Sequence, residues 1–152
     1  MKDFYYKSPI GVLKINGDND YIYGIEFSNK EKKSQTPTYE SIKECKKQLT
    51  EYFKGKRKKF DLKIRLSGTP FQIKVWNELK KIPYGKTISY STIAKKIGFP
   101  GAYRAVGNAN NKNKFAIVIP CHRVIAKNGS LSGYAAGIDK KRWLINLESS
   151  NK

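Results

Sequence analysis

A thiol and an imidazole stand next to each other at Cys121-His122, within the segment Pro120-Cys121-His122-Arg123-Val124. His122 is the only histidine of the chain, and the segment follows the apolar run 115–119, which predicts a buried strand. A cysteine with an ordinary pKa of about 8.5 is mostly protonated at neutral pH, whereas a neighbouring base raises the fraction of reactive thiolate. The pair therefore indicates nucleophilic chemistry at sulfur, with His122 as the base.

Two conditions must hold for this chemistry. Adjacent residues of a regular strand point to opposite sides, so the chain must turn sharply after Pro120. The imidazole also needs an acceptor that orients it, and the acidic residues of the second half of the chain are Glu78, Asp139 and Glu148. Spacing alone does not choose among them. For the dipeptide taken by itself, a buried strand-end cysteine beside a structural histidine is the better explanation.

The other titratable residues give no sign of a metal centre or a disulfide. Cys45 falls on the apolar face of a predicted helix, where a buried cysteine behaves as a small hydrophobe. One histidine and two distant cysteines form no ligand set of zinc spacing, and we expect neither metal nor cofactor. We expect two free thiols in a reducing, cytoplasmic compartment. The N-terminus is not signal-like, and no apolar run approaches the roughly 20 residues of a membrane span.

The 152-residue chain has 31 Lys and Arg residues against 12 Asp and Glu residues, a net charge of +19. Such a charge attracts polyanions through counterion release, which predicts a nucleic-acid partner. The alternative is a lysine-rich composition whose charges are scattered over many surfaces. The basic run 54–59 is better explained as a solvated loop than as a nucleic-acid-binding tail.

The spacing of apolar residues divides the chain into two units, 1–67 and 68–152. The first unit has alternating and helical patterns in turn, which predicts a compact α+β fold. Its expected elements are a β-hairpin formed by 4–15 and 21–27 around a turn at 17–20, a helix that follows Thr38, and a strand at 60–66.

The second unit is mostly helical. Thr69-Pro70 begins a helix as an N-cap followed by proline at the first helical position. Two short helices, joined by Gly98-Phe99-Pro100-Gly101, predict a helix-turn-helix. The expected helices after the first are a short one that opens at Ser89 or Tyr90, one at 102–109, and a last one at 139–147 with Trp143, Leu144 and Leu147 directed inward.

The second helix of the helix-turn-helix has an unusual composition. Arg104 is surrounded by Ala105, Gly107 and Ala109, so this surface can approach DNA closely but has few side chains that read base edges. This composition favours a sequence-tolerant contact in the minor groove over operator recognition. The alternative is a helix packed by small residues in a core.

Read together, these segments closely resemble the O6-alkylguanine-DNA alkyltransferase family, the methylated-DNA–protein-cysteine methyltransferases. The resemblance covers the whole second unit in order, and its motifs are very specific. They are Gly68 to Gln72, Val75-Trp76, Ile82 to Gly85, Ser89-Tyr90, Arg104 to Gly107, Asn113, Pro120 to Val124, Gly133-Tyr134 and Lys141 to Glu148.

The first unit matches more weakly, through Ser8-Pro9-Ile10-Gly11 and the hairpin. The resemblance implies an α+β protein with a small N-terminal α/β domain of ribonuclease-H-like topology. A mostly helical C-terminal domain with a winged-helix-like helix-turn-helix would follow it and carry DNA binding and alkyl transfer.

The resemblance also implies the catalytic residues. Cys121 would attack the alkyl carbon on O6 of guanine, and O4-alkylthymine is a second candidate substrate. His122 would take the thiol proton through a water, and Glu148 would orient His122. The product would be a thioether that nothing nearby hydrolyses, so each molecule would act once.

The remaining site residues follow from the same resemblance. Double-stranded DNA with an alkylated base would bind a monomer through the minor groove, and the damaged nucleotide would leave the stack. Arg104 would fill the vacated space, with Ser89, Tyr103, Ala105 and Gly107 as further DNA-binding residues. The substrate-binding residues would be Tyr90 as a donor to the leaving guanine, Asn113 as a bridge to the recognition helix, the carbonyls of Cys121 and Val124, and Tyr134 and Ala135 in a loop over the base. Some relatives have serine where this chain has Ala135.

Two other classes of function compete with this one. A DNA-damage sensor or helix-turn-helix regulator could use the same unit, but relatives of the sensing type replace the nucleophile, which is present here as Cys121. A cysteine hydrolase could use Cys121 and His122, but it leaves Arg104 and Tyr90 unexplained.

Overall fold

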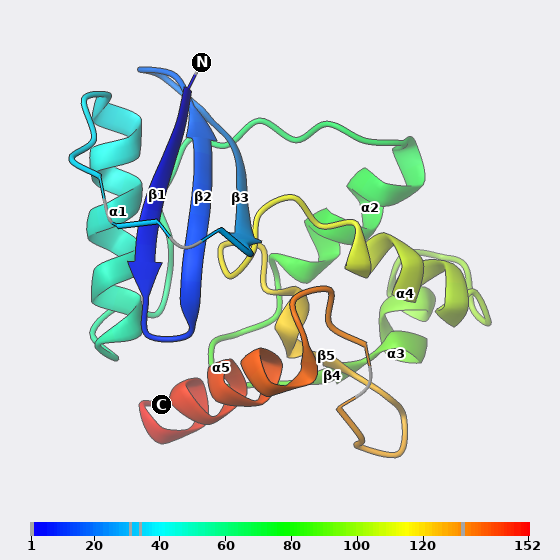
Figure 1. The fold of residues 1–152 in the computed structure, drawn as a ribbon. Coiled ribbons are helices and arrows are strands. Elements are labelled where there is room, and N and C mark those ends of the chain that lie inside the picture. The colour runs from blue at the N-terminus through cyan, green and yellow to red at the C-terminus, as the bar shows by residue number, and fades with distance from the viewer. Residues whose placement is uncertain (1, 31, 34, 132) are drawn as a thin grey trace. The chain divides into compact units, whose positions relative to one another are not determined.

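The computed structural model describes residues 2–30, 32–33, 35–131 and 133–152. Two compact units, residues 1–66 and 67–152, make up the chain. The first combines a β-sheet with a helix and the second is mostly helical (Figure 1), so the predicted α+β class is confirmed.

The sheet of the first unit has three antiparallel strands rather than the two of the predicted hairpin. They are β1 (Lys2–Ser8), β2 (Gly11–Gly17) and β3 (Ile22–Ser28), in that order across the sheet. The run 4–15 is broken because Ser8 Oγ accepts a hydrogen bond from Ile10 N at 3.2 Å and donates one to Gly11 O at 2.6 Å. Gly11 has a φ of 128°, which glycine adopts without a side-chain clash. The turn at 17–20 joins β2 to β3 as predicted.

Helix α1 (Glu40–Phe53) packs on this sheet and confirms the helical pattern after Thr38. Its buried face meets the inward side chains of the strands in a core formed by Phe4, Leu13, Ile15, Ile25, Ile42, Leu49, Tyr52 and Phe53. Cys45 lies on the same face and is fully buried, and burial raises the pKa of its thiol to about 12. Cys45 is therefore part of the core, as the sequence predicted.

The predicted strand at 60–66 is almost entirely absent. Only Ile64 pairs with the sheet, through Ile22 of β3. The side-chain amide of Gln48 binds the backbone of Asp61 instead, since Nε2 donates to Asp61 O and Oε1 accepts from Asp61 N, both at 2.9 Å. This contact occupies the groups that a neighbouring strand needs, so the segment stays extended without forming a ladder.

The second unit begins with the predicted N-cap. Helix α2 (Pro70–Leu79) starts at Thr69, whose side chain accepts from Gln72 N while Gln72 binds back to Thr69 N in a capping box. The elements that follow are β4 (Ile88–Ser89), α3 (Tyr90–Lys96), α4 (Tyr103–Asn111), the 3-10 turn η1 (Cys121–Arg123), β5 (Val124–Ile125) and α5 (Ile138–Ser150).

Helices α3 and α4 form the predicted helix-turn-helix and pack on each other and on α2. The indole of Trp76 fixes α2 to α4 by donating to Ala109 O at 2.8 Å. Helix α4 buries Val106 and Ala109 but exposes Arg104 and Ala105. The alternative of a helix enclosed in a core is therefore wrong.

The run 115–119 is not a strand. Ile119 N donates to Phe115 O and Val118 N to Ala116 O, so the segment coils through successive tight turns. Ile117 has a φ of 72°, a left-handed conformation that a β-branched residue rarely adopts. Asn113 stabilises this coil through hydrogen bonds to the backbone of Phe115 and Ile119.

Helix α5 is longer than predicted, and its most buried positions differ in part from the predicted ones. They are Lys141, Leu144 and Glu148, spaced i, i+3 and i+7. Of the residues predicted to face inward, Leu144 is buried, whereas Trp143 and Leu147 are only half-buried. The helix directs two charged side chains inward because both find partners in η1 and β5.

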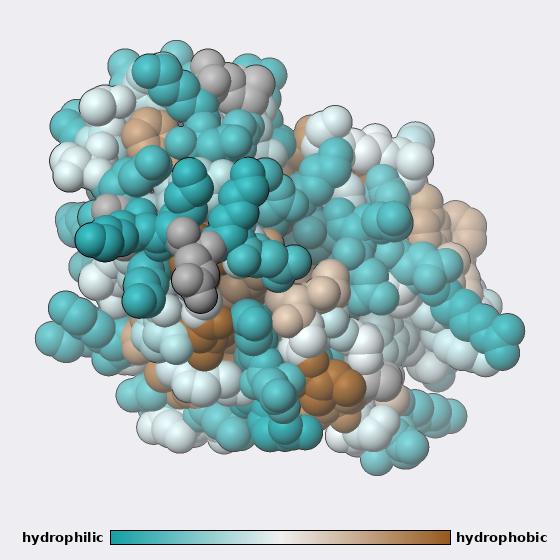
Figure 2. All heavy atoms as spheres, in the orientation of Figure 1, coloured by the Kyte–Doolittle hydropathy of each residue, from teal (hydrophilic) through white to brown (hydrophobic). Residues whose placement is uncertain are grey.

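The surface drawn in Figure 2 is largely hydrophilic, with small separate hydrophobic patches. Among the helices of the described residues, none has the length and apolarity that crossing a membrane demands.

Candidate active site

Cys121 and His122 lie in the single turn η1, which follows Pro120 with φ −80° and ψ 64°. Cys121 N donates to Ile119 O at 2.8 Å and Arg123 N to Pro120 O at 3.0 Å, so the chain turns at this point instead of running on as a strand. The sharp turn after Pro120 that an adjacent thiol and imidazole require is therefore present. Both side chains are buried, with 7% of Cys121 and 0% of His122 exposed.

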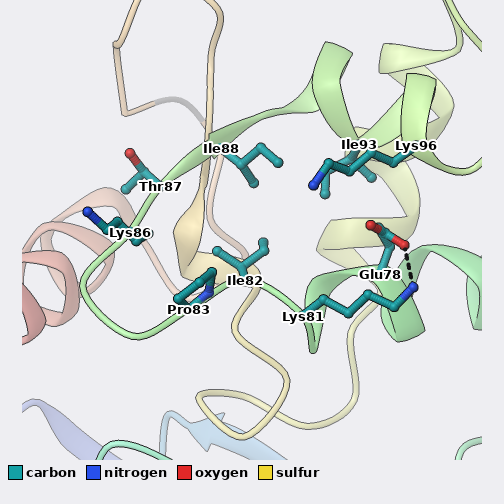
Figure 3. Close-up of a pocket in the computed structure, with 9 residues that line it drawn as sticks. All are labelled: Glu78, Lys81, Ile82, Pro83, Lys86, Thr87, Ile88, Ile93 and Lys96. Carbon is teal, nitrogen blue, oxygen red and sulfur yellow. Dashed lines mark hydrogen bonds and ion pairs between the residues drawn. The ribbon is translucent and has the colours of Figure 1, made fainter.

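Glu148 is the acceptor that orients His122. Its Oε2 lies 2.6 Å from His122 Nε2. The two other candidates form ion pairs elsewhere. Glu78 pairs with Lys81 at 3.2 Å in a separate pocket (Figure 3). Asp139 pairs with Arg142 at 3.2 Å on the surface.

Arg123 completes this cluster, although its role was not predicted from the sequence. Its Nε and Nη2 donate to the two oxygens of Glu148 at 2.7 and 3.0 Å, and its Nη1 donates to Ile82 O at 2.7 Å. Gly85 N also donates to Glu148, at 3.2 Å. The carboxylate therefore accepts from the imidazole, the guanidinium and a backbone amide. A charged residue directly after Cys-His and a glutamate in the last helix were the available signals for this pairing.

These contacts fix the ionisation states of the cluster. Burial would raise the pKa of Glu148, but the hydrogen bonds from His122 and Arg123 and the charge of Arg123 outweigh it and hold that pKa well below its usual range. Burial lowers the pKa of His122 despite the contact with Glu148. A neutral imidazole beside an ionised carboxylate donates from Nε2. Nδ1 then has the free lone pair, and it is buried without a hydrogen-bond partner. Nδ1 is therefore the atom that can act as a base.

The environment of the Cys121 thiol acts on its pKa in opposite directions. Burial raises the pKa, while a hydrogen bond from Asn113 and the positive charge of Lys141 lower it. Asn113 donates from Nδ2 to Ile119 O at 2.8 Å and accepts from Phe115 N at 2.9 Å. The same side chain thus shapes the coil before the turn and stabilises the thiolate.

Lys141 is a second functional candidate that the sequence analysis missed. Its ammonium is buried, donates to Val124 O at 2.6 Å and Gly133 O at 3.3 Å, and lies 5.8 Å from the centre of the Tyr90 ring. Burial lowers the pKa of Lys141 to about 8. Lys141 lies three residues before Leu144 and seven before Glu148, so it shares their face of the helix. If Glu148 had been used to assign the buried face of α5, Lys141 would have been predicted to lie on it.

The two carbonyls expected to bind the guanine amino group each accept a hydrogen bond already. Asn110 Nδ2 donates to Cys121 O at 3.3 Å, and Lys141 Nζ donates to Val124 O. A carbonyl oxygen has two lone pairs, so each still has room for one further donor. The existing contacts hold both oxygens in fixed positions.

Two of the predicted substrate-binding residues, Tyr90 and Tyr134, lie near the thiol, since Cys121 contributes to the raised pKa of each. Tyr90, at the start of α3, is half-buried and donates to Gly133 O at 3.5 Å. Burial and the neighbouring Cys121 raise the pKa of Tyr90. Tyr134 is buried with an unpartnered hydroxyl, and the adjacent Ala135 is exposed. Tyr90 and Lys141 thus both hold the loop that contains Tyr134 and Ala135 through the carbonyl of Gly133.

The predicted DNA-binding residues divide into two groups. Arg104 and Ala105 are exposed on α4, together with Tyr103, which is 46% exposed. Ser89 caps α3 by accepting from Thr92 N, and Gly107 lies where an added Cβ would touch the Tyr90 ring at 3.9 Å. The structure therefore places the first group at the surface and the second group in support of α3. In the described part of the chain, no three His, Cys, Asp or Glu side chains are arranged to hold a metal ion.

Removing the charge of Lys141 should make the Cys121 thiol harder to ionise. In Lys141→Met we expect the pH dependence of Cys121 alkylation by iodoacetamide to move to higher pH, because the thiolate loses a nearby cation. Reaction at neutral pH should slow by about tenfold for each unit of the shift. Mass spectrometry of the Cys121 peptide measures the rate. An unchanged profile would show that Lys141 serves only to hold Val124 and Gly133.

Comparisons with known proteins identify the family of this chain. Two family models match: the 6-O-methylguanine DNA methyltransferase ribonuclease-like domain over residues 1–66 and the DNA binding domain of the same family over residues 70–150. A methylated-DNA–protein-cysteine methyltransferase of Methanosarcina acetivorans is 48% identical over 150 residues, which cover 95% of this chain and 96% of that protein.

Solved structures give the same result. The O6-methylguanine methyltransferase of Mycobacterium tuberculosis superposes with a TM-score of 0.89 at 40% identity, covering 99% of this chain and 93% of that one. A structure of the M. tuberculosis protein in complex with DNA also gives a TM-score of 0.89, at 42% identity, with 97% and 92% covered. Because both units match in order and nearly the whole chain is covered, this chain belongs to the 6-O-methylguanine DNA methyltransferase family.

Proposed function

We propose that Cys121 is the acceptor when this chain reverses alkylation damage in DNA, with His122 and Glu148 as its catalytic partners. The chain is a methyltransferase that moves the alkyl group of O6-alkylguanine from DNA to a cysteine. The observation that carries the assignment to Cys121 is the contact of 2.6 Å between Glu148 and His122 Nε2, which leaves Nδ1 of the adjacent imidazole as a buried, unpartnered base. Cys45, in contrast, is enclosed in the core of the first unit.

The reaction at Cys121 is a displacement at a saturated carbon. His122 Nδ1 takes the thiol proton through a water, and Glu148 stabilises the protonated imidazole and its orientation. Arg123 holds Glu148 in place for this role. The sulfur forms a bond to the alkyl carbon, the bond from that carbon to O6 breaks, and its electron pair stays on guanine. The Tyr90 hydroxyl donates a hydrogen bond to the leaving base. The product is a thioether, which water does not hydrolyse, so each molecule reacts once.

The alkylated base must leave the duplex to reach a buried sulfur. Arg104, exposed near the start of α4, enters the vacated space from the minor groove, and the small side chain of Ala105 lets the helix approach the backbone. The loop with Tyr134 and Ala135 closes over the extruded base. The net charge of +19 supports DNA as the partner of a monomeric, cytoplasmic protein.

Intact-mass analysis tests the assignment of the acceptor. After incubation with a duplex containing O6-methylguanine, the protein should gain the mass of one methyl group and no more, however long the incubation. Peptide mapping should place the methyl group on Cys121, with Cys45 unmodified as an internal control. A methyl group on any other residue, or repeated turnover, would contradict the proposal.

Loss of Arg104 should separate base extrusion from chemistry. In Arg104→Ala we expect transfer from a methylated duplex to fall by about 100-fold, because nothing replaces the flipped base in the stack. Transfer from free O6-benzylguanine, which needs no extrusion, should keep its rate. Single-turnover rates on the two substrates measure the difference. Equal losses on both would show that Arg104 does not act in extrusion.

A further inference from the structure

We propose that Phe99 and Tyr103 form an aromatic edge that packs against DNA beside Arg104 and supports base extrusion. This inference rests on the proposed function, because it assigns a DNA contact to residues outside the active site.

The two side chains of the aromatic edge are large and hydrophobic, yet they are exposed to solvent. The large hydrophobic side chains exposed among the described residues are Phe99 at 48%, Tyr103 at 46% and Ile138 at 43%. Phe99 lies in the turn of the helix-turn-helix and Tyr103 is the first residue of α4, directly before Arg104. Two exposed aromatic rings four residues apart at one end of a recognition-type helix indicate a surface that a partner covers.

The Phe99 ring is held in place by neighbouring groups. The Phe99 ring meets Phe71 of α2 edge to face at 5.8 Å, and the ammonium of Lys74 lies 5.2 Å from its centre. Ala102 N donates to Phe99 O at 3.0 Å, which closes the turn before α4. The aromatic edge is therefore a preformed surface, and little conformational freedom is lost when a partner covers it.

The charges around the aromatic edge select the partner. The guanidinium of Arg104 lies 5.9 Å from the centre of the Tyr103 ring, and Lys74 covers Phe99. The sequence has no Asp or Glu from residue 79 to residue 138. A surface of flat apolar rings between cations fits a polyanion that also has flat apolar groups. The sugars and bases of a nucleic acid have both properties.

The contact between Tyr103 and Arg104 gives the aromatic edge a second effect. A cation over a ring is attracted by its negative face, so Tyr103 restricts where the guanidinium goes before DNA binds. An arginine ordered in this way loses less freedom when it enters the duplex. Tyr103 thus acts as a positioning residue for Arg104 and as a contact for the neighbouring nucleotide.

Alanine variants of the aromatic edge test this inference. For Tyr103→Ala and Phe99→Ala we expect the Kd for an O6-methylguanine duplex to rise by about tenfold, the loss of roughly one stacking contact. The slope of log Kd against log salt should stay that of the parent chain, because no phosphate contact is removed. Tyr103→Phe keeps the ring and should restore the parental Kd and transfer rate.

The matched control is Tyr5→Ala, which removes another tyrosine under a cation, 5.2 Å from Lys32, in the first unit. It should bind and transfer like the parent. Free O6-benzylguanine separates this inference from the proposed function: all variants should transfer its benzyl group to Cys121 at the parental rate. If both alanine variants keep the parental Kd and the parental transfer rate on duplex, the inference is wrong, while Cys121 remains the acceptor. An equal loss of transfer from duplex and from the free base would overturn the inference in the same way. A reduced salt slope would also overturn it, since it would indicate a phosphate contact.

Discussion

Replacing Cys121 with alanine should abolish alkyl transfer completely, because the sulfur is the atom that accepts the alkyl group and alanine has none. The buried thiol carries out the reaction but is not needed for binding DNA, so Cys121→Ala should still bind the methylated duplex. We expect a long-lived complex with the base held in the site, and no methyl group on the protein after prolonged incubation. A duplex with a labelled methyl group, counted on the protein after proteolysis, measures the transfer.

Cys45→Ala is the matched control for this result. Cys45 is buried like Cys121, but burial is what raises the pKa of its thiol to about 12, with no hydrogen bond or cation to lower it. Its replacement should leave one methyl group transferred per molecule, with a modest loss of stability from the small cavity. Transfer by Cys121→Ala would show that the acceptor lies elsewhere, and loss of transfer in Cys45→Ala would identify that other acceptor.

Much of the helical framework could be predicted from local signals. The capping box at Thr69, the short helix after Ser89 and the glycine-bounded turn before α4 all depend on side chains within a few residues of each other. The predicted end of α3 before Gly98 was correct for the same reason. Local patterns determine such features because their hydrogen bonds close within one turn of chain.

The errors share a different physical origin. The run 115–119 has the composition of a buried strand, yet the amide of Asn113 and the closely packed turns around Ile117 bind its backbone groups first. The segment 60–66 alternates like a strand, but Gln48 from α1 occupies the backbone of Asp61. In both cases a side chain replaces a neighbouring strand as the hydrogen-bond partner. Apolar periodicity contains no information about that competition.

The site itself was predicted in part. The residues that the resemblance implied for the reaction, Cys121, His122 and Glu148, come together in the structure. Arg123 and Lys141 were missed because buried cations contradict the usual location of charged residues at the surface. Their partners, a carboxylate and three carbonyls, come from other segments of the chain. Only the fold brings these groups together.

Glu148→Gln should cause a large loss of both activity and stability. Glutamine keeps the shape of the side chain but not its charge, so Arg123 loses its counterion and His122 loses the acceptor that fixes its tautomer. Breaking one partner of a buried ion pair costs about 3–5 kcal/mol, which we expect in the free energy of unfolding. The transfer rate should fall by about 100-fold or more, the usual contribution of a positioned base. Denaturant unfolding and single-turnover transfer measure the two effects.

The pH dependence of unfolding distinguishes the charge of Glu148 from its packing. The pKa of Glu148 is lowered on folding, so its stabilisation is complete above the ordinary value of about 4.3 and is lost as the pH falls toward the folded pKa. The pKa of His122 is also lowered, which adds a loss that begins below about 6.5. Glu148→Gln should reduce the loss below about 4.3 that the parent chain shows. Asp139→Asn, which removes an exposed contact to Arg142 from the same helix, should leave the profile unchanged. If the two variants unfold alike, the carboxylate of Glu148 does not hold the cluster together.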